Sequence, residues 1–273
     1  MSLRAPIENS IFGDYRGRLW EPFTRAISEY ALIQPGDRIA VCISGGKDSM
    51  LMAKLMQLYQ QKSSTPFELV YLVMDPGYNR ANREKIESNA ALLGIPITVF
   101  ESDIFAVANS TEQSPCYLCA RMRRGHLYAK AKALGCNKIA LGHHFTDVIE
   151  TTLLGMFYGS QLQAMLPKLH SDNFEGMVLI RPLYCVHEED IIAWSEANGL
   201  QFIQCACRFT EAYTHSDDGI GSSKRQEIKQ LIKTLRKTIP DVEQSIFNSI
   251  HHVNIDTVPL YKSDGTAHFY LDK

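Results

Sequence analysis

The stretch that decides the fold is RIAVCISGGKDSMLMAKLMQL, residues 38–58. It begins with an apolar run, Arg38–Ile43, of the kind found in a strand buried on both faces. A glycine pair, a lysine and two serines follow, and a segment with helical apolar spacing, Asp48–Gln61, comes next. A strand, a small-residue turn and a helix together present backbone N–H groups and a positive helix end to an anion. The stretch therefore predicts a phosphate-binding loop in an α/β fold.

The same alternation continues along the chain. It is typical of βαβ units that build a parallel sheet with helices on both faces. Gly94, Gly135 and Gly199 each follow an expected helix, where glycine favours a left-handed cap. The expected strands are Arg38–Ile43, Glu68–Met74, Pro96–Glu101, Lys138–Gly142 and Met177–Leu183, and the expected helices are Asp48–Gln61, Asn82–Leu93, Ala120–Leu134, Thr146–Tyr158 and Glu188–Asn198.

The chain has 273 residues, enough to bury the core of one large domain. We expect a single domain with a helical extension at each end. The N-terminal extension carries an amphipathic pattern that ends at Pro35–Gly36, and the C-terminal one carries two helices after a loop. These expected segments are the domain 1–273, the extensions 1–36 and 208–273, the loop 211–223, and the helices 224–237 and 241–252.

The composition is that of an ordinary globular protein, with 45% hydrophobic and 21% charged residues. No stretch approaches ~18 uninterrupted apolar residues, so no transmembrane helix or membrane partner is expected. The N-terminus lacks the apolar core of a secretory signal, and we expect a cytoplasmic location. In that compartment the seven cysteines are expected to be thiols or metal ligands rather than disulfides.

Basic residues cluster in two segments although the net charge is only -2. Residues 121–132 contain five arginines and lysines and no acid, and residues 224–237 contain six against Glu227 alone. Such stripes can bind a nucleic-acid backbone, or they can be solvated helix faces.

The phosphate-binding loop does not fit the Walker pattern, which needs G-x-x-x-x-G-K-[ST]. Ser44–Ser49, SGGKDS, instead resembles the PP-loop of the ATP pyrophosphatase superfamily, whose members cleave ATP between the α and β phosphates and commonly adenylate a substrate. MDPG (Met74–Gly77) and LGHHFTDVIET (Leu141–Thr151) match two further elements of that superfamily. All three follow expected strands, at the sheet edge where open α/β folds bind ligands.

The resemblance implies an ATP site with catalytic roles for Lys47 and Asp147. Asp147 and Glu150 are three residues apart and would share one helix face. A carboxylate there could hold Mg2+ against the phosphates, or it could simply cap the helix dipole; the resemblance favours Asp147 as the functional one. The residues implied to bind the nucleotide are Ser44, Gly45, Gly46, Lys47, Asp48, Ser49, Asp75, Gly142, His143 and Arg181.

A second informative stretch is SPCYLCARMRRG, with Cys116 and Cys119 in C-x-x-C spacing. The spacing alone fits a redox dithiol, half a zinc site or half an iron–sulfur site. Placed between a PP-loop and GHHFTDVIET, the stretch resembles the tRNA 2-thiocytidine synthetases, in which such a pair and one distant cysteine hold a [4Fe-4S] cluster. The resemblance implies Cys207 as the third ligand, with Cys205 as the alternative because CACRFT departs from the family's C-x-x-C-Gly spacing.

The remaining cysteines, Cys42, Cys136 and Cys185, lie outside any matching motif and are expected to be buried thiols.

The resemblance implies an ATP-dependent tRNA sulfurtransferase. Such an enzyme adenylates a cytidine of the anticodon loop, at position 32, and replaces its 2-oxygen with sulfur. It implies tRNA and ATP as partners, a cysteine desulfurase or sulfide as sulfur source, a homodimer, and both basic segments against the tRNA backbone. Two alternatives stay open: a PP-loop enzyme that thiolates another tRNA base, and a cluster- or zinc-dependent RNA-binding protein without turnover.

Overall fold

The computed structural model describes residues 4–102, 115–203, 224–263 and 265–272, with only the backbone for 115–121 and 123. The chain forms two compact units. Unit 1 comprises Met1–Asp147 and Leu166–Ile220, and unit 2 comprises Val148–Met165 and Gly221–Lys273. None of the helices that the structure describes is long and apolar enough to cross a membrane.

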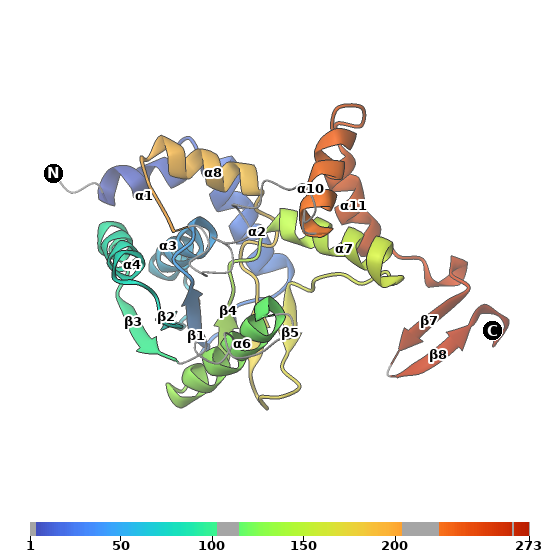
Figure 1. The fold of residues 1–273 in the computed structure, drawn as a ribbon, viewed down its shortest axis with the longest axis horizontal. Coiled ribbons are helices and arrows are strands. Elements are labelled where there is room, and N and C mark those ends of the chain that lie inside the picture. Colours follow the sequence, from blue (N-terminus) through green and yellow to red (C-terminus); the bar gives the residue numbers. More distant parts are fainter. Residues whose placement is uncertain (1–3, 103–114, 204–223, 264, 273) are drawn as a thin grey trace. The chain divides into compact units, whose positions relative to one another are not determined.

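Unit 1 is built on a six-stranded sheet in the order β3-β2-β1-β4-β6-β5 (Figure 1). Every pairing is parallel except that of β5 with β6, which is antiparallel. The strands are β1 (Arg38–Ile43), β2 (Glu68–Asp75), β3 (Ile97–Glu101), β4 (Lys138–Ala140), β5 (Lys168–His170) and β6 (Val178–Ile180). The predicted α/β fold with a mostly parallel sheet is confirmed.

Helices cover both faces of this sheet, as predicted. Ile39, Val41 and Ile43 of β1 face one apolar cluster, whereas Ala40 and Cys42 face another that includes residues of α6. Because both faces are covered, β1 is apolar along its length rather than alternating. The helices of unit 1 are α1 (Arg4–Phe12), the π-helical η1 (Arg16–Trp20), α2 (Glu21–Glu29), α3 (Lys47–Lys62), α4 (Arg80–Leu93), α6 (Pro115–Ala133) and α8 (Glu188–Ala197). Helix α7 (Phe145–Gly159) begins in unit 1 and continues in unit 2.

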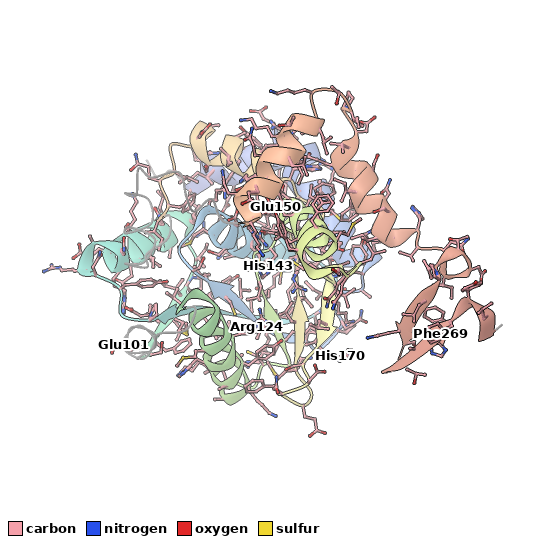
Figure 2. The ribbon with its side chains drawn as sticks, turned by 45° about the vertical axis from the view of Figure 1, so that its right-hand side comes forward. Glu101, Arg124, His143, Glu150, His170 and Phe269 are labelled. Carbon is pink, nitrogen blue, oxygen red and sulfur yellow. The ribbon has the colours of Figure 1, made fainter. Side chains whose placement is uncertain are left out.

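The order of the strands reverses between β1 and β4. From β1 the chain runs outward through β2 to β3, and then returns to β4 on the other side of β1. The loops that leave two such neighbouring strands diverge, and the crevice between them is the usual ligand site of an open α/β sheet. Here those loops are Ser44–Gly46 and Leu141–His144. Figure 2 labels His143 in the second loop and Arg124 on α6.

Three details of the sheet differ from the expected elements. Strand β5 was not predicted, because a strand as short as Lys168–His170 carries too few residues to show a period. Strand β3 begins at Ile97 rather than Pro96, since proline has no N–H to donate to the ladder. Strands β4 and β6 are both shorter than expected; after β6 the chain turns, with the N–H of Tyr184 donating to the carbonyl of Arg181.

Unit 2 contains the C-terminal part of the chain, with both predicted helices. They are α10 (Lys224–Leu235) and α11 (Val242–His251). A short helix η2 (Ile255–Thr257), an antiparallel hairpin of β7 (Leu260–Ser263) and β8 (Thr266–Phe269), and η3 (Tyr270–Asp272) follow. The hairpin was not predicted in a segment expected to be helical. The residue that could have indicated a hairpin is Gly265, whose positive φ of 75° suits a hairpin turn.

Candidate active site

The SGGKDS loop is shaped by a glycine that no other residue could replace without rearrangement. Gly45 has a φ of 87°, in the left-handed region. A Cβ atom added there would lie 2.6 Å from Cγ1 of Ile86 and 2.7 Å from Cδ1 of Ile203. The next residue, Gly46, is the N-cap of α3, so the loop leads directly into the positive end of that helix.

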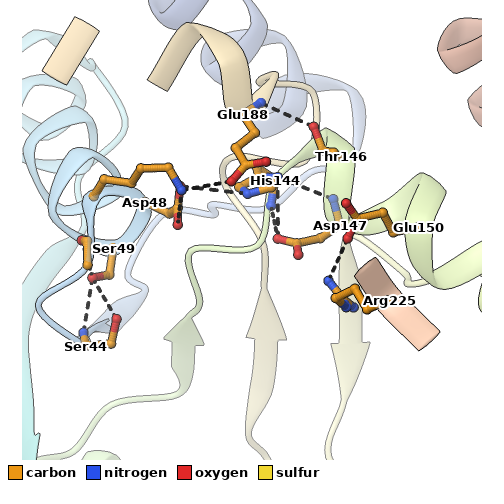
Figure 3. A network of polar contacts seen from close by, with 11 residues as sticks. Ser44, Asp48, Ser49, His144, Thr146, Asp147, Glu150, Glu188 and Arg225 are labelled. Carbon is orange, nitrogen blue, oxygen red and sulfur yellow. Dashed lines mark hydrogen bonds and ion pairs between the residues drawn. The ribbon is translucent and has the colours of Figure 1, made fainter. Parts of the chain in front are cut away.

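Two serine hydroxyls hold the loop closed (Figure 3). The N–H of Ser44 donates to Oγ of Ser49 over 3.1 Å, and that hydroxyl donates to the carbonyl of Gly46 over 3.0 Å. The two hydroxyl oxygens are 3.1 Å apart. The serines therefore fix the conformation of the loop.

Gly142 allows the loop after β4 to approach the start of α3. An added Cβ would lie 3.1 Å from both Cα and N of Ser49, which are backbone atoms. A side chain here would push the two loops apart. Glycine is thus required at position 142 because the two loops approach each other closely where the strand order reverses.

Lys47 is held by two carboxylates. Its Nζ lies 3.0 Å from Oε1 of Glu188 and 3.1 Å from Oδ1 of Asp48. Burial lowers the pKa of Lys47, but the attraction of Asp48 and Glu188 outweighs it and the pKa is raised, so the side chain is a cation. Glu188 is fixed in turn, because its N–H donates to Oγ1 of Thr146 over 3.3 Å.

Glu188 was missed by the sequence analysis. It lies in the first turn of α8 with Glu189 and Asp190, where acids are expected simply to complement the helix dipole. Only the three-dimensional structure reveals its role, because there its carboxylate lies next to Nζ of Lys47.

His144 connects the two loops. The N–H of Asp147 donates to Nδ1 of His144 over 3.3 Å, and the N–H of His144 donates to Oδ2 of Asp147 over 3.1 Å. The other ring nitrogen, Nε2, lies 3.8 Å from Oδ1 of Asp48. A chain of polar groups therefore runs from Lys47 to Asp147; Figure 3 shows its members Asp48, His144 and Asp147.

The two loops border a pocket of about 400 Å³, a size suited to a small ligand. Six of the residues predicted to bind nucleotide or to act in catalysis line it, together with apolar side chains and one arginine. The lining residues are Cys42, Ile43, Ser44, Asp48, Ser49, Met74, Arg124, Leu127, Leu141, Gly142, His143 and Asp147. Of the predicted residues, Gly45, Gly46, Lys47, Asp75 and Arg181 are not part of this lining.

His143 presents a neutral imidazole to the pocket. Burial, followed by the positive charges of Arg181 and Arg124, lowers the pKa of His143 to about 4. Its Nδ1 is buried and has no hydrogen-bond partner within the described part of the chain. A buried polar atom left unpaired is costly, and a ligand in the pocket could satisfy it.

Asp75 and Arg181 are engaged by the protein itself. The carboxylate of Asp75 accepts the N–H groups of Gly77 and Tyr78 at 2.9 and 2.7 Å and pairs with Arg83 at 2.6 Å. Burial raises the pKa of Asp75, but these three contacts together lower it. The guanidinium of Arg181 donates to the carbonyl of Leu166. A role for either residue in nucleotide binding stays a prediction.

Asp48 and Asp147 fit a magnesium ion. They lie in the first turns of α3 and α7, directly after the two loops, and both line the pocket. Mg2+ prefers one or two carboxylates together with phosphate and water oxygens. No larger set of ligating side chains that could hold a metal ion occurs among the described residues.

Three cysteines outside the matched motifs are buried thiols, as predicted. Cys42, Cys136 and Cys185 are buried, and burial raises the pKa of each, that of Cys42 to about 12. A metal ligand must be a thiolate, so these three thiols are unsuited.

The remaining four of the seven cysteines are Cys116, Cys119, Cys205 and Cys207. The first two lie on α6 at positions i and i+3, one turn apart on one face of the helix. Cys205 and Cys207 lie outside the described residues, so the choice between them stays a prediction.

Comparison with known proteins gives consistent results. Residues 20–215 match the PP-loop domain family. The tRNA-cytidine(32) 2-sulfurtransferase of Syntrophotalea carbinolica is 38% identical over 232 residues, which are 84% of this chain and 86% of that protein. The enzyme of the same name from Vibrio cholerae is 36% identical over 260 residues, which cover 93% of this chain and 78% of that enzyme.

A similar fold occurs among solved structures. The U34-tRNA thiolase NcsA from Methanococcus maripaludis, solved with its [4Fe-4S] cluster, superposes with a TM-score of 0.64 at 20% identity, over 86% of this chain and 79% of that one.

Proposed function

This chain belongs to the PP-loop family and, within it, to the tRNA-cytidine(32) 2-sulfurtransferases, and from that membership we propose how its site replaces the 2-oxygen of cytidine 32 with sulfur. The obstacle is the leaving group, because a cytidine 2-oxygen departs poorly. Attaching AMP to it makes it a good leaving group, and this is the use of ATP. The observation that carries the proposal is the meeting of the SGGKDS loop and the Gly142–Asp147 loop at one pocket.

In the first step the cytidine 2-oxygen attacks the α-phosphorus of ATP. The bond to the oxygen that bridges the α and β phosphates breaks, and pyrophosphate leaves. The loop N–H groups, the N-terminus of α3 and Lys47 stabilise the charge that develops on pyrophosphate. Lys47 is already a cation, and it exchanges the carboxylate of Glu188 for a phosphate oxygen.

Asp48 and Asp147 would hold Mg2+, which when bound would supply positive charge beside the phosphates. The two carboxylates line the pocket from the first turns of α3 and α7, and His144 contacts both of them. His144 therefore acts as a positioning residue, which keeps the two carboxylates at a set distance before the metal and nucleotide arrive.

In the second step sulfide sulfur attacks C2 of the cytidine, the C2–O bond breaks and AMP leaves. Cys116, Cys119 and Cys207 would hold a [4Fe-4S] cluster, which when bound supplies an iron without a protein ligand to present sulfur. Sulfur comes from sulfide directly, or from the persulfide of a cysteine desulfurase, whose outer sulfur a thiol reductant brings to the sulfide level with two electrons. The protein works as a homodimer.

The tRNA backbone is bound through the basic residues of the C-terminal helices, which are exposed. They are Lys224, Arg225, Lys229, Lys233, Arg236 and Lys237. Two of them also make contacts within unit 2: Arg225 pairs with Glu150 at 3.1 Å, and Nζ of Lys224 lies 4.7 Å from the ring centre of Tyr158.

The test uses protein reconstituted anaerobically with iron and sulfide, then supplied with tRNA, ATP, Mg2+ and sulfide. Nucleoside mass spectrometry should find 2-thiocytidine at position 32, and chromatography should find one AMP and one pyrophosphate for each sulfur transferred. A matched tRNA with uridine at position 32 should stay unmodified. Formation of ADP and orthophosphate, thiolation of the control tRNA, or tRNA binding without any AMP would contradict the proposal.

A further inference from the structure

One positive side chain lines the nucleotide pocket, and it does not come from the PP-loop. Among the described lining residues, Arg124 of α6 alone carries a permanent positive charge, since His143 is neutral. The sequence analysis placed Arg124 in a basic stripe that faces tRNA. Figure 2 shows Arg124 on α6, and it borders the pocket together with Ser44 and Asp48 of the PP-loop.

The Arg124 guanidinium is not used by the protein itself. Within the described part of the chain it makes no hydrogen bond or ion pair, whereas Arg83 pairs with Asp75 and Arg181 donates to Leu166. Its charge nevertheless reaches the buried groups of the site, because it contributes to lowering the pKa of both His143 and Arg181. An unpaired guanidinium beside a pocket is suited to an anionic ligand, which it can bind through two parallel N–H groups.

The apolar part of the lining offers a place for a nucleotide base. Leu127 also lines the pocket, and it lies three residues after Arg124 on the same face of α6. With Ile43, Met74 and Leu141 it provides an apolar surface for a base. A base against Leu127 places the first phosphate one helical turn away, near Arg124, and leaves the outer phosphates to the PP-loop.

We propose that Arg124 binds the α-phosphate of ATP and keeps this contact in the adenylated tRNA. This inference rests on the proposed function and adds to it a residue that touches the reacting phosphorus group. The α-phosphate gains negative charge as the cytidine oxygen attacks it, and a guanidinium already in place stabilises that charge. Arg124 lies on the helix that bears Cys116 and Cys119, so one helix serves both halves of the reaction.

The test compares Arg124→Gln with Lys132→Gln, a matched change at an exposed residue of the same helix whose Nζ donates to the carbonyl of Glu175. Calorimetry measures binding of adenosine, AMP and ATP, and filter binding measures binding of tRNA. Arg124→Gln should lower the affinity for AMP and for ATP by about 10- to 100-fold, the effect expected from losing a hydrogen bond to a charged group. Arg124→Gln should bind adenosine and tRNA as the wild type does, and Lys132→Gln should leave the binding of adenosine, AMP and ATP unchanged.

Arg124→Lys separates charge from geometry. Lysine keeps the charge but loses the two parallel donors, so it should recover only part of the AMP affinity. Weaker binding of adenosine to Arg124→Gln would mean that the pocket had collapsed, and unchanged AMP affinity with weaker tRNA binding would return Arg124 to the tRNA surface. Either result overturns the inference. Wild-type protein that binds no ATP would refute the proposed function itself, which distinguishes the two failures.

Discussion

Nζ of Lys47 lies 3.0 Å from Oε1 of Glu188, so the PP-loop lysine is paired with a carboxylate from the first turn of α8. The side chains are 26% and 18% exposed, which makes the pair partly shielded from solvent. Such a pair has two consequences. The pair keeps the lysine charged and oriented, and a phosphate that binds Lys47 as proposed must displace the carboxylate to reach it.

Lys47→Ala should abolish most of the adenylation activity. Removing one charged donor from a site of developing charge slows a reaction by about 10²- to 10³-fold. The fold should persist, because the Lys47 side chain is partly exposed and its amine pairs with the carboxylates of Asp48 and Glu188. AMP formation and the unfolding midpoint measure the two effects. Lys62→Ala, at the exposed end of the same helix, is the control and should leave AMP formation unchanged.

Glu188→Gln should tighten ATP binding by a few fold. The change removes the competing charge, and partly exposed ion pairs contribute about 0.2–1 kcal/mol. The contact between Glu188 and Thr146 uses the backbone N–H and survives the change. Calorimetric ATP affinity is the measurement, with Glu196→Gln on the exposed side of α8 as the control. A loss of affinity would mean that Glu188 serves mainly to aim the lysine.

The sequence predicts this site unevenly, and the reason is physical. SGGKDS and LGHHFTD are each an unbroken stretch of sequence that follows a buried strand. The local pattern alone therefore places Ser44 and Asp147 at one edge of the sheet. Glu188 and Arg124 come from helices whose sequences indicate only acids in a first turn and a basic stripe. Their part in the site depends on how helices pack on the sheet, which a one-dimensional pattern does not contain.

The same limit applies to the fold. Strand β1 is apolar and buried after its first residue, Arg38, and could be predicted to the residue, whereas β5, Lys168–His170, was missed. This segment is a strand because it pairs with β6, and a segment this short shows no hydrophobic period of its own.

Gly142→Ala should weaken ATP binding and destabilise the protein. The added methyl group would lie 3.1 Å from the backbone of Ser49, so one of the two loops must move. Overpacking of this kind typically costs about 1–3 kcal/mol. Urea unfolding and ATP affinity are the measurements. Gly125→Ala is the control, since its added methyl meets no atom within 4 Å, and alanine in the helix α6 should leave ATP affinity intact and slightly stabilise the protein.

Asp75→Asn should alter how stability depends on pH. The folded protein holds the pKa of Asp75 below its ordinary value of about 3.9. A carboxyl with a lowered pKa stabilises the fold above its ordinary pKa, and this contribution is lost as the pH falls through the folded value. Wild-type stability should therefore fall more steeply below about pH 5 than that of the variant.

At neutral pH the same variant should be less stable by about 1.5–3 kcal/mol, the value of hydrogen bonds to a charged group. The side chain of Asp75 is 9% exposed, so solvent screens these contacts little. Urea unfolding between pH 3 and pH 7, chosen to span the acid range, measures both effects. Glu84→Gln, which breaks an exposed pair with Arg80, should change neither; parallel curves for wild type and Asp75→Asn would refute the account.

The cysteines should divide into two groups when each is changed to alanine in anaerobically reconstituted protein. Cys116→Ala, Cys119→Ala and Cys207→Ala should each lose the visible absorption of a [4Fe-4S] cluster together with sulfur transfer, because one missing thiolate leaves the cluster incompletely held. Cys205→Ala should keep most of both. Cys185→Ala is the matched control, since Cys185 is a buried thiol with a raised pKa. AMP formation should survive in all variants if the ATP pocket is independent of the cluster. Zinc is the physical competitor at such thiolates: stoichiometric zinc that iron cannot displace, in protein that still transfers sulfur, would remove the cluster from the mechanism.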